Sequence, residues 1–269
     1  MIPRLLALLS PLLIAGLSAA PEPFTTFANG ETFRYRVGWG IFTRAGEITI
    51  AAHQDLHDGR QVMRITTATS SKGFVRGVYK YDDSGAALID LATGRLLATE
   101  EQSEDSRRRT ESRTDFDYEA GVARHRDTTR PHRNTDLPLP AGGQPIDLIT
   151  SLVAPRHWGM KVGDTRDVIV HFGREFFPIT LHAEQIEEIS TPMGKFQALR
   201  IVPRMDKETP RGLFARGGEI KVWISQGEKP LPVRMQLKLK YGTATLLLQE
   251  HTIAPGAPTV EPANTSTGL

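Results

Sequence analysis

The stretch 30–37, GETFRYRV, decides the fold class, because its apolar and polar residues alternate strictly. Phe33, Tyr35 and Val37 would lie on one face of an extended strand, and the polar side chains between them on the other. Such alternation is typical of a strand that is buried on one face and solvated on the opposite face. We therefore expect an antiparallel β protein.

The same period of two recurs along most of the chain. The predicted strands cover residues 46–53, 61–70, 77–81, 86–90, 95–101, 107–116, 165–172, 176–187, 196–202, 219–225, 231–240 and 243–250. Turn residues separate them at Asp58-Gly59, Ser84-Gly85, Thr93-Gly94 and Tyr241-Gly242. So many successive strands favour a large curved antiparallel sheet or an open barrel, because long open sheets tend to curl. A two-sheet β-sandwich is the alternative.

One segment departs from this period. Between two prolines, residues 145–154 place apolar side chains at helical spacing, which predicts a short helix at about 146–153. The preceding stretch 130–143 is rich in proline and glycine and reads as a linker. Residues 21–253 would then form one β-rich domain with halves at about 30–127 and 163–250, joined by a linker and helix at 128–162. The tail 254–269 has the composition of a disordered end.

The two halves also resemble each other. Three pairs of segments match in the same order, at offsets near 133 to 140: Gly30-Glu31-Thr32 with Gly163-Asp164-Thr165, residues 59–65 with 194–201, and residues 74–77 with 214–217. An ancestral duplication is one interpretation of this pattern. Chance recurrence of strand and turn chemistry is the other.

The first twenty residues predict export. Arg4 precedes a short apolar run, and Ser18-Ala19-Ala20 provides the small residues of a cleavage site, so residues 1–20 read as a secretory signal peptide. The apolar run is shorter than a membrane-spanning helix requires. The chain has no cysteine, hence no disulfide and no thiol chemistry, and its 33 Lys and Arg nearly balance 31 Asp and Glu. The overall charge predicts no nucleic-acid partner.

Segments 30–47, 163–164, 191–201 and 218–233 together resemble an exported bacterial family, the domain of unknown function 3108. The resemblance runs from about Gly30 to Glu250. It implies a β-rich domain in the bacterial envelope, commonly the Gram-negative periplasm. The family has no established catalytic residues, so the resemblance assigns no functional role.

No common nucleophile, zinc or nucleotide motif occurs, so we predict no catalytic residue, cofactor or metal site. His53 and His57 straddle a polar turn. His171 and His182, with Glu184 nearby, fall on two strands of a predicted hairpin, where a shared ligand competes with ordinary polar positions. The adjacent carboxylates Asp82-Asp83, Glu100-Glu101 and Glu187-Glu188 would point to opposite faces of their strands.

Two kinds of segment are candidates for ligand binding. The first is a basic hairpin, in which Arg107, Arg109 and Arg113 would share one face at period two, with Arg124 and Arg126 close by on the paired strand. Interleaved acidic residues favour a solvated ribbon of ion pairs that protects an edge strand, and an anion-binding rim is the alternative.

The second kind is a glycine-flanked phenylalanine loop, present once in each half. These loops contribute Phe74 and Arg76 in the first half, and Leu213, Phe214 and Arg216 in the second. Each could cover an apolar pocket, or be a turn whose apolar residues tuck into the core.

Export, the curved β pattern and these loops favour a non-enzymatic periplasmic protein that binds or carries a lipid or other amphiphile on the concave face of its sheet. An interaction module for an envelope protein or polysaccharide is the first alternative. An enzyme acting on envelope glycans or lipids is the second.

Overall fold

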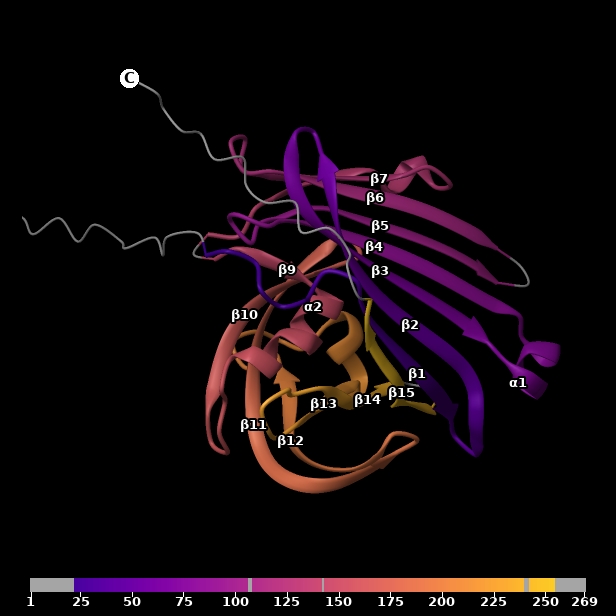
Figure 1. Cartoon of the computed structure of the whole chain (residues 1–269). Coiled ribbons are helices and arrows are strands. Elements are labelled where there is room, and N and C mark those ends of the chain that lie inside the picture. Colours follow the sequence, from indigo (N-terminus) through magenta and orange to yellow (C-terminus); the bar gives the residue numbers. More distant parts are fainter. Residues whose placement is uncertain (1–21, 106–107, 142, 240–241, 255–269) are drawn as a thin grey trace, which may run out of the picture.

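The computed structural model describes residues 22–105, 108–141, 143–239 and 242–254, and in this part of the chain all strands join one strongly curved sheet (Figure 1). The strand order is β8-β7-β6-β5-β4-β3-β2-β1-β15-β14-β13-β12-β11-β10-β9. The first and last strands, β1 and β15, pair side by side in the middle, so the two halves of the chain extend in opposite directions from this seam. The sheet is not closed, because β8 and β9 end it without pairing to each other.

The first half contains β1 (Glu31–Trp39), β2 (Phe42–His57), β3 (Arg60–Ser71), α1 (Gly73–Val78), β4 (Tyr81–Asp90), β5 (Leu96–Asp105), β6 (Arg109–Asp117), β7 (Val122–Asp127), η1 (Pro131–Arg133) and β8 (Thr135–Pro138). The second half contains β9 (Pro145–Asp147), α2 (Leu148–Val153), η2 (Ala154–His157), β10 (Thr165–Phe172), β11 (Glu175–Thr191), β12 (Gly194–Arg204), η3 (Gly212–Gly217), β13 (Glu219–Ser225), β14 (Pro232–Leu239) and β15 (Gly242–Ile253).

The core lies on the concave side of the sheet and is filled by the chain's own side chains. Phe33 on β1 is opposite Ile50 on β2, and both are buried together with Ile201 and Val222 of the second half. Fully burying one such side chain stabilises the fold by about 1.5–3 kcal/mol. The apolar residues of the alternating pattern therefore lie on the side of each strand that packs against this core.

These observations confirm the predicted curved sheet, which is antiparallel except for the parallel β9–β10 pair, and its short helix. The helix α2 begins at Leu148 rather than at about 146, because residues 145–147 form β9, and Asp147 caps it by accepting a hydrogen bond from the Thr150 backbone N–H at 3.0 Å. Thr93-Gly94 and Asp58-Gly59 form turns outside the strands.

Two sequence predictions in the first half are wrong. The predicted strand at 77–81 lies mostly in α1 and the residues after it, because Gly73 adopts a φ of +54° that turns the chain out of β3. The predicted turn at Ser84-Gly85 lies inside β4. A Cβ on Gly85 would lie 3.1 Å from the Thr67 hydroxyl and 3.2 Å from the Glu100 carbonyl oxygen, so this glycine allows close packing between strands.

The order of elements supports the proposal of a duplication. A long strand, its hairpin partner, a six-residue helical segment and two further strands follow one another in each half, as β2-β3-α1-β4-β5 and as β11-β12-η3-β13-β14. Left-handed glycines recur at matching positions: Gly30 and Gly163, Gly40 and Gly173, Gly59 and Gly194, Gly73 and Gly212. Superposition of the halves in this order is the remaining test.

No helix in the described part of the chain is long and apolar enough to cross a membrane. The predicted signal peptide at 1–20 lies outside the described residues, as does the predicted tail after residue 254.

Candidate functional site

Five exposed apolar side chains come from the turn between β1 and β2 and from α1 and the residue after it, two elements that contact each other. We call this surface the α1 tip; it comprises Ile41, Phe42, Phe74, Val78 and Tyr79. The exposed fraction is 88% for Ile41 and 73% for Phe74, and the rings of Phe42 and Phe74 stack with their centroids 5.9 Å apart. Isolated exposed apolar residues are ordinary, but several of them on two adjoining elements, two in direct contact, indicate an interaction surface.

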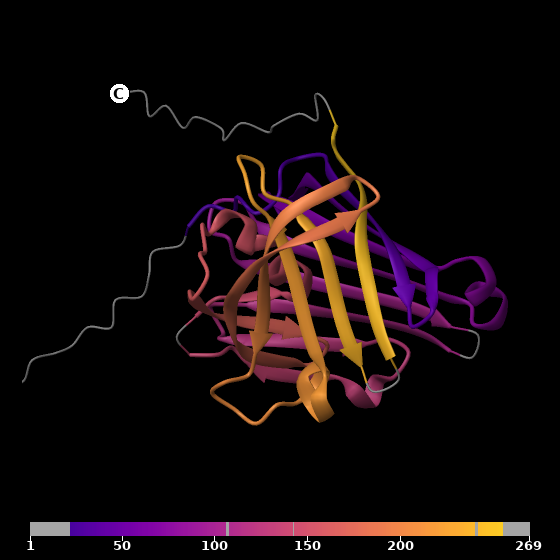
Figure 2. The same ribbon diagram turned by 90° about the horizontal axis from the view of Figure 1, so that it is seen from below.

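Local geometry explains why the α1 tip stays outside the core. No residue of α1 is buried, and in Figures 1 and 2 the helix stands at the end of β3, away from the orange strands of the second half. The Lys72 backbone N–H donates to the Ala45 carbonyl oxygen at 2.8 Å. Arg76 donates to both carboxylate oxygens of Asp82, at 2.8 and 3.0 Å. The first contact ties the start of α1 to β2, and the second ties α1 to β4.

Beside the α1 tip is a groove with a volume of ≈ 370 Å³, which we call the cationic groove. Its lining residues are Arg36, Arg44, Gly46, Glu47, Lys72, Pro192 and Gln249. The long hairpin β11–β12 bends across the ends of β13–β15 (Figure 2), and its turn at Pro192 closes one side of the groove. Both halves of the chain therefore build it.

Arg76 and Phe74 were predicted from sequence, whereas the rest of this site was missed. Ile41 and Phe42 carried a usable signal, because two large apolar residues beside Gly40 in a hairpin turn serve no core. Arg36 and Lys72 carried none, since their position in one groove depends on strand register and on the bend of a distant hairpin.

The loop of the second half, η3, is arranged differently from α1. Leu213 and Phe214 are half-buried and pack against the core, as expected for turn residues tucked inward. Arg211 fixes the loop, because it pairs with Glu175 and donates to the Phe176 carbonyl oxygen at 2.8 Å. A second groove, of ≈ 410 Å³, lies against Phe214, and Arg216 is exposed. A ligand-binding role for this loop stays a prediction.

Among the described residues of the basic hairpin, Arg109 and Arg113 share one face of β6, Arg113 lies opposite Arg126 and Asp115 opposite Arg124, and each of these arginines has an acidic partner. The ion pairs are Arg109–Glu111, Arg113–Glu100, Arg113–Asp115, Arg124–Asp117 and Arg126–Asp136. Arg107 lies outside the described residues. This arrangement is the ribbon of compensated charge that the sequence favoured, and it leaves little net charge for an anion-binding rim.

The histidines and carboxylates do not form a metal site in the described part of the chain. His171 and His182 lie near opposite ends of the β10–β11 pair, because His171 is opposite Phe176 and His182 is opposite Thr165. They therefore share no ligand. His182 instead contacts the Asp206 carboxylate at 2.5 Å.

Adjacent carboxylates point to opposite faces, as predicted. Glu100 faces outward to Arg64 and Arg113, whereas Glu101 lies on the inner face with Asp83. Although the Glu101 side chain is partly exposed, the protein atoms around its carboxyl group, and next the Asp83 charge, raise its pKa, and the Gly173 backbone N–H opposes this rise. This inner pair was missed from sequence, although alternation along two paired strands was the signal that could have found it.

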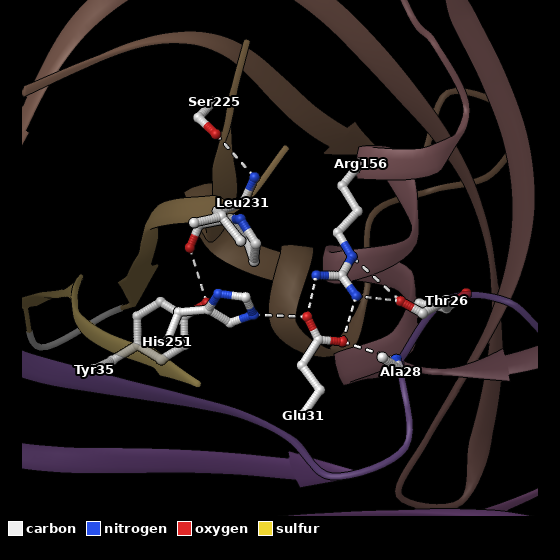
Figure 3. Close-up of polar contacts among 9 residues, drawn as sticks. Thr26, Ala28, Glu31, Tyr35, Arg156, Ser225, Leu231 and His251 are labelled. Atoms are coloured by element: carbon white, nitrogen blue, oxygen red, sulfur yellow. Dashed lines mark hydrogen bonds and ion pairs between the residues drawn. The ribbon is translucent and has the colours of Figure 1, made fainter. Parts of the chain in front are cut away.

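An ion pair with both partners buried, Glu31–Arg156, lies at the β1–β15 seam (Figure 3). The Glu31 carboxylate accepts two hydrogen bonds from Arg156, at 2.7 and 2.6 Å, and contacts His251 Nε2 at 2.8 Å. Arg156 also donates to the Thr26 carbonyl oxygen at 2.6 Å. Although burial alone would raise the pKa of Glu31, hydrogen bonds from Arg156 and His251 lower it to about 2. This network fastens η2 to the seam and is a structural element.

Comparisons with known proteins support the fold and the family. The profile of a family described as protein of unknown function, DUF3108, matches residues 34–249. A β-barrel-like protein of the DUF1849 family from Brucella abortus is similar in structure, with a TM-score of 0.51 and 9% identity, covering 88% of this chain and 100% of that chain. No curated protein is similar in sequence.

Two further solved structures are more distant. A candidate lipoprotein from Parabacteroides distasonis has a TM-score of 0.31 and 10% identity, covering 87% of this chain and 100% of that chain. A candidate exported protein with a YmcC-like fold from Bacteroides fragilis has a TM-score of 0.31 and 11% identity, covering 87% and 99%.

Proposed function

We propose that this chain, which belongs to the DUF3108 family, binds lipid in the bacterial envelope by docking its α1 tip on an anionic membrane surface. The family is one of unknown function, so the proposal rests on the chain's own geometry. The predicted signal peptide at 1–20 supports a periplasmic location, where such a surface faces the protein.

The exposure of the α1 tip carries this proposal. Ile41, Phe74 and Val78 are each more than two-thirds exposed, although they are large apolar side chains. Burying one such side chain in the acyl boundary of a membrane contributes about 1.5–3 kcal/mol, so several of them together outweigh the cost of association. In water these side chains stay exposed, so this stabilisation is absent.

Charge complementarity identifies an anionic membrane as the occupant. Arg44 is two residues from Phe42 and Lys72 precedes α1 directly, so cations flank the apolar side chains. Apolar side chains beside Lys and Arg are the pattern of proteins that rest in the interface of an anionic bilayer. The concave face of the sheet offers less, because the core fills it.

Flotation with lipid vesicles tests the proposal, using the chain from residue 21 and phosphatidylglycerol-containing or purely phosphatidylcholine vesicles. We expect wild type to float preferentially with the anionic vesicles. Ile41→Ser/Phe74→Ser should weaken this partitioning by about tenfold or more, because that loss corresponds to only about 1.4 kcal/mol.

A matched control replaces apolar residues that are exposed elsewhere. Leu56→Ser/Ile253→Ser changes side chains that are 67% and 53% exposed, outside the α1 tip, and should float like wild type. Failure of wild type to float, or equal losses in both double variants, would contradict membrane docking. If Ile41→Ser/Phe74→Ser floats like wild type, the α1 tip does not dock the membrane, and a partner such as an envelope protein becomes the better candidate for this surface.

A further inference from the structure

We infer that the cationic groove binds a phosphate ester of a small polyol, which is the chemistry of an anionic phospholipid headgroup. As a lipid site it rests on the proposed function, but the groove can be probed with a soluble ester. Its four charged lining residues are three cations, Arg36, Arg44 and Lys72, and one carboxylate, Glu47.

These three cations differ from most arginines on the same sheet. Within the described residues, no ion pair shorter than 4.0 Å involves Arg36, Arg44 or Lys72, although Arg36 is directly opposite Glu47 in the β1–β2 register. Two residues away on β1, Arg34 pairs with Glu250 at 3.1 Å. The groove therefore keeps cationic charge, whereas the charge of neighbouring Arg34 is compensated by Glu250.

An anion is the ligand that relieves this charge. A cleft lined by one sign of charge focuses its field and raises the local concentration of the opposite ion. Guanidinium groups bind phosphate oxygens through paired N–H donors, and a lysine ammonium adds a point charge. Two arginines and one lysine in a single groove thus match a phosphate group.

The volume indicates a ligand larger than phosphate alone. Small-molecule sites typically measure about 300–1,000 Å³, and the groove reaches ≈ 370 Å³. The Gln249 amide can donate to or accept from a hydroxyl group, and the Glu47 carboxylate accepts from one. A polyol attached to the phosphate would use these two residues, which a bare phosphate ion would not.

The position of the groove matches a lipid whose acyl chains meet the α1 tip. Lys72 lines the groove and immediately precedes α1, while Arg44 lines it and follows Phe42 by two residues. A headgroup in the groove would therefore lie beside the apolar side chains, as headgroup and acyl chain lie beside each other at a bilayer surface.

Titration with glycerol 1-phosphate, followed by NMR amide shifts, tests the site without a membrane. We expect millimolar binding to wild type, weakened about tenfold or more by Arg36→Gln or by Arg44→Gln, since each removes a charge-assisted contact. Arg34→Gln is the matched control and should bind like wild type, because Arg34 is outside the groove and paired. Uncharged glycerol should not bind.

Three results would overturn the inference: no binding of glycerol 1-phosphate to wild type, equal binding to Arg36→Gln, or binding of inorganic phosphate as tight as that of the ester. Vesicle flotation separates this inference from the proposed function. If Ile41→Ser/Phe74→Ser floats like wild type while Arg36→Gln still loses glycerol 1-phosphate, docking by the tip fails and the phosphate-ester site stands. If the ester does not bind but the tip variant loses flotation, only the groove site fails.

Discussion

Replacing Glu31 with glutamine should lower the free energy of unfolding by about 3–5 kcal/mol, because it leaves the Arg156 cation buried without a counterion. The two side chains are 3% and 5% exposed, so water cannot take over the lost contacts. The new amide would also place an N–H group against the donors of Arg156. Urea denaturation followed by tryptophan fluorescence measures the difference.

Two further variants identify the cause of this loss. Glu188→Gln removes an exposed partner of Lys195, whose pair is 50% and 71% exposed, and should change stability by less than about 1 kcal/mol. The double variant Glu31→Gln/Arg156→Met should recover part of the loss, because no unpaired charge then remains. Equal effects of Glu31→Gln and Glu188→Gln would show that the seam does not depend on its buried charges.

The same pair makes the protein sensitive to strong acid. The folded-state pKa of Glu31, about 2, lies below its ordinary value of 4.5. Its stabilisation is therefore complete above about pH 4.5 and is lost as the pH falls through about 2, a contribution of about 3 kcal/mol. Glu31→Gln should flatten the stability curve in that window.

Local sequence pattern predicted the features that depend on neighbouring residues. Alternation at Phe33, Tyr35 and Val37 marked the buried face correctly, and the apolar spacing between two prolines located the short helix to within about two residues. The strand predicted at 77–81 failed because a short alternating run also suits an exposed turn, and Gly73 decides between them through its φ.

Features that depend on the folded chain could not be predicted in this way. Glu31 and Arg156 are 125 residues apart, and neither carries a local sign that they pair. The cationic groove combines residues of β1 and β15 with the turn of a bent hairpin. Only the complete sheet brings such residues together, so the sequence indicated the fold class while the candidate site required the structure.

Replacing His171 with phenylalanine should remove a second dependence of stability on acid, at a milder pH. His171 is 2% exposed, its ring meets Phe116 edge-on with centroids 5.0 Å apart, and no described residue forms a hydrogen bond with its Nε2 atom. Burial, and then repulsion from His125, lower the pKa of His171 to about 4. The folded protein thus holds this ring neutral among aromatic side chains.

The direction of the effect follows from proton uptake on unfolding. Between pH 6.5 and about 4 the unfolded chain protonates His171 and the folded chain does not, so stability falls as the pH falls through this window. The full loss is about 3 kcal/mol. Phenylalanine keeps the edge-on ring contact and cannot take a proton, so His171→Phe should become progressively more stable relative to wild type on acidification.

Urea denaturation at several pH values between about 7 and 4 measures this difference. His125 and Asp147 titrate near His171, and burial lowers the pKa of the first and raises that of the second, so the comparison uses the difference between two proteins in which both groups are retained. His53→Gln, at an exposed position on β2, should follow the wild-type curve. If the stability of His171→Phe instead falls with pH as steeply as that of wild type, the buried ring is not the source of acid sensitivity. The contact between Phe116 and β10 would then accommodate a protonated His171.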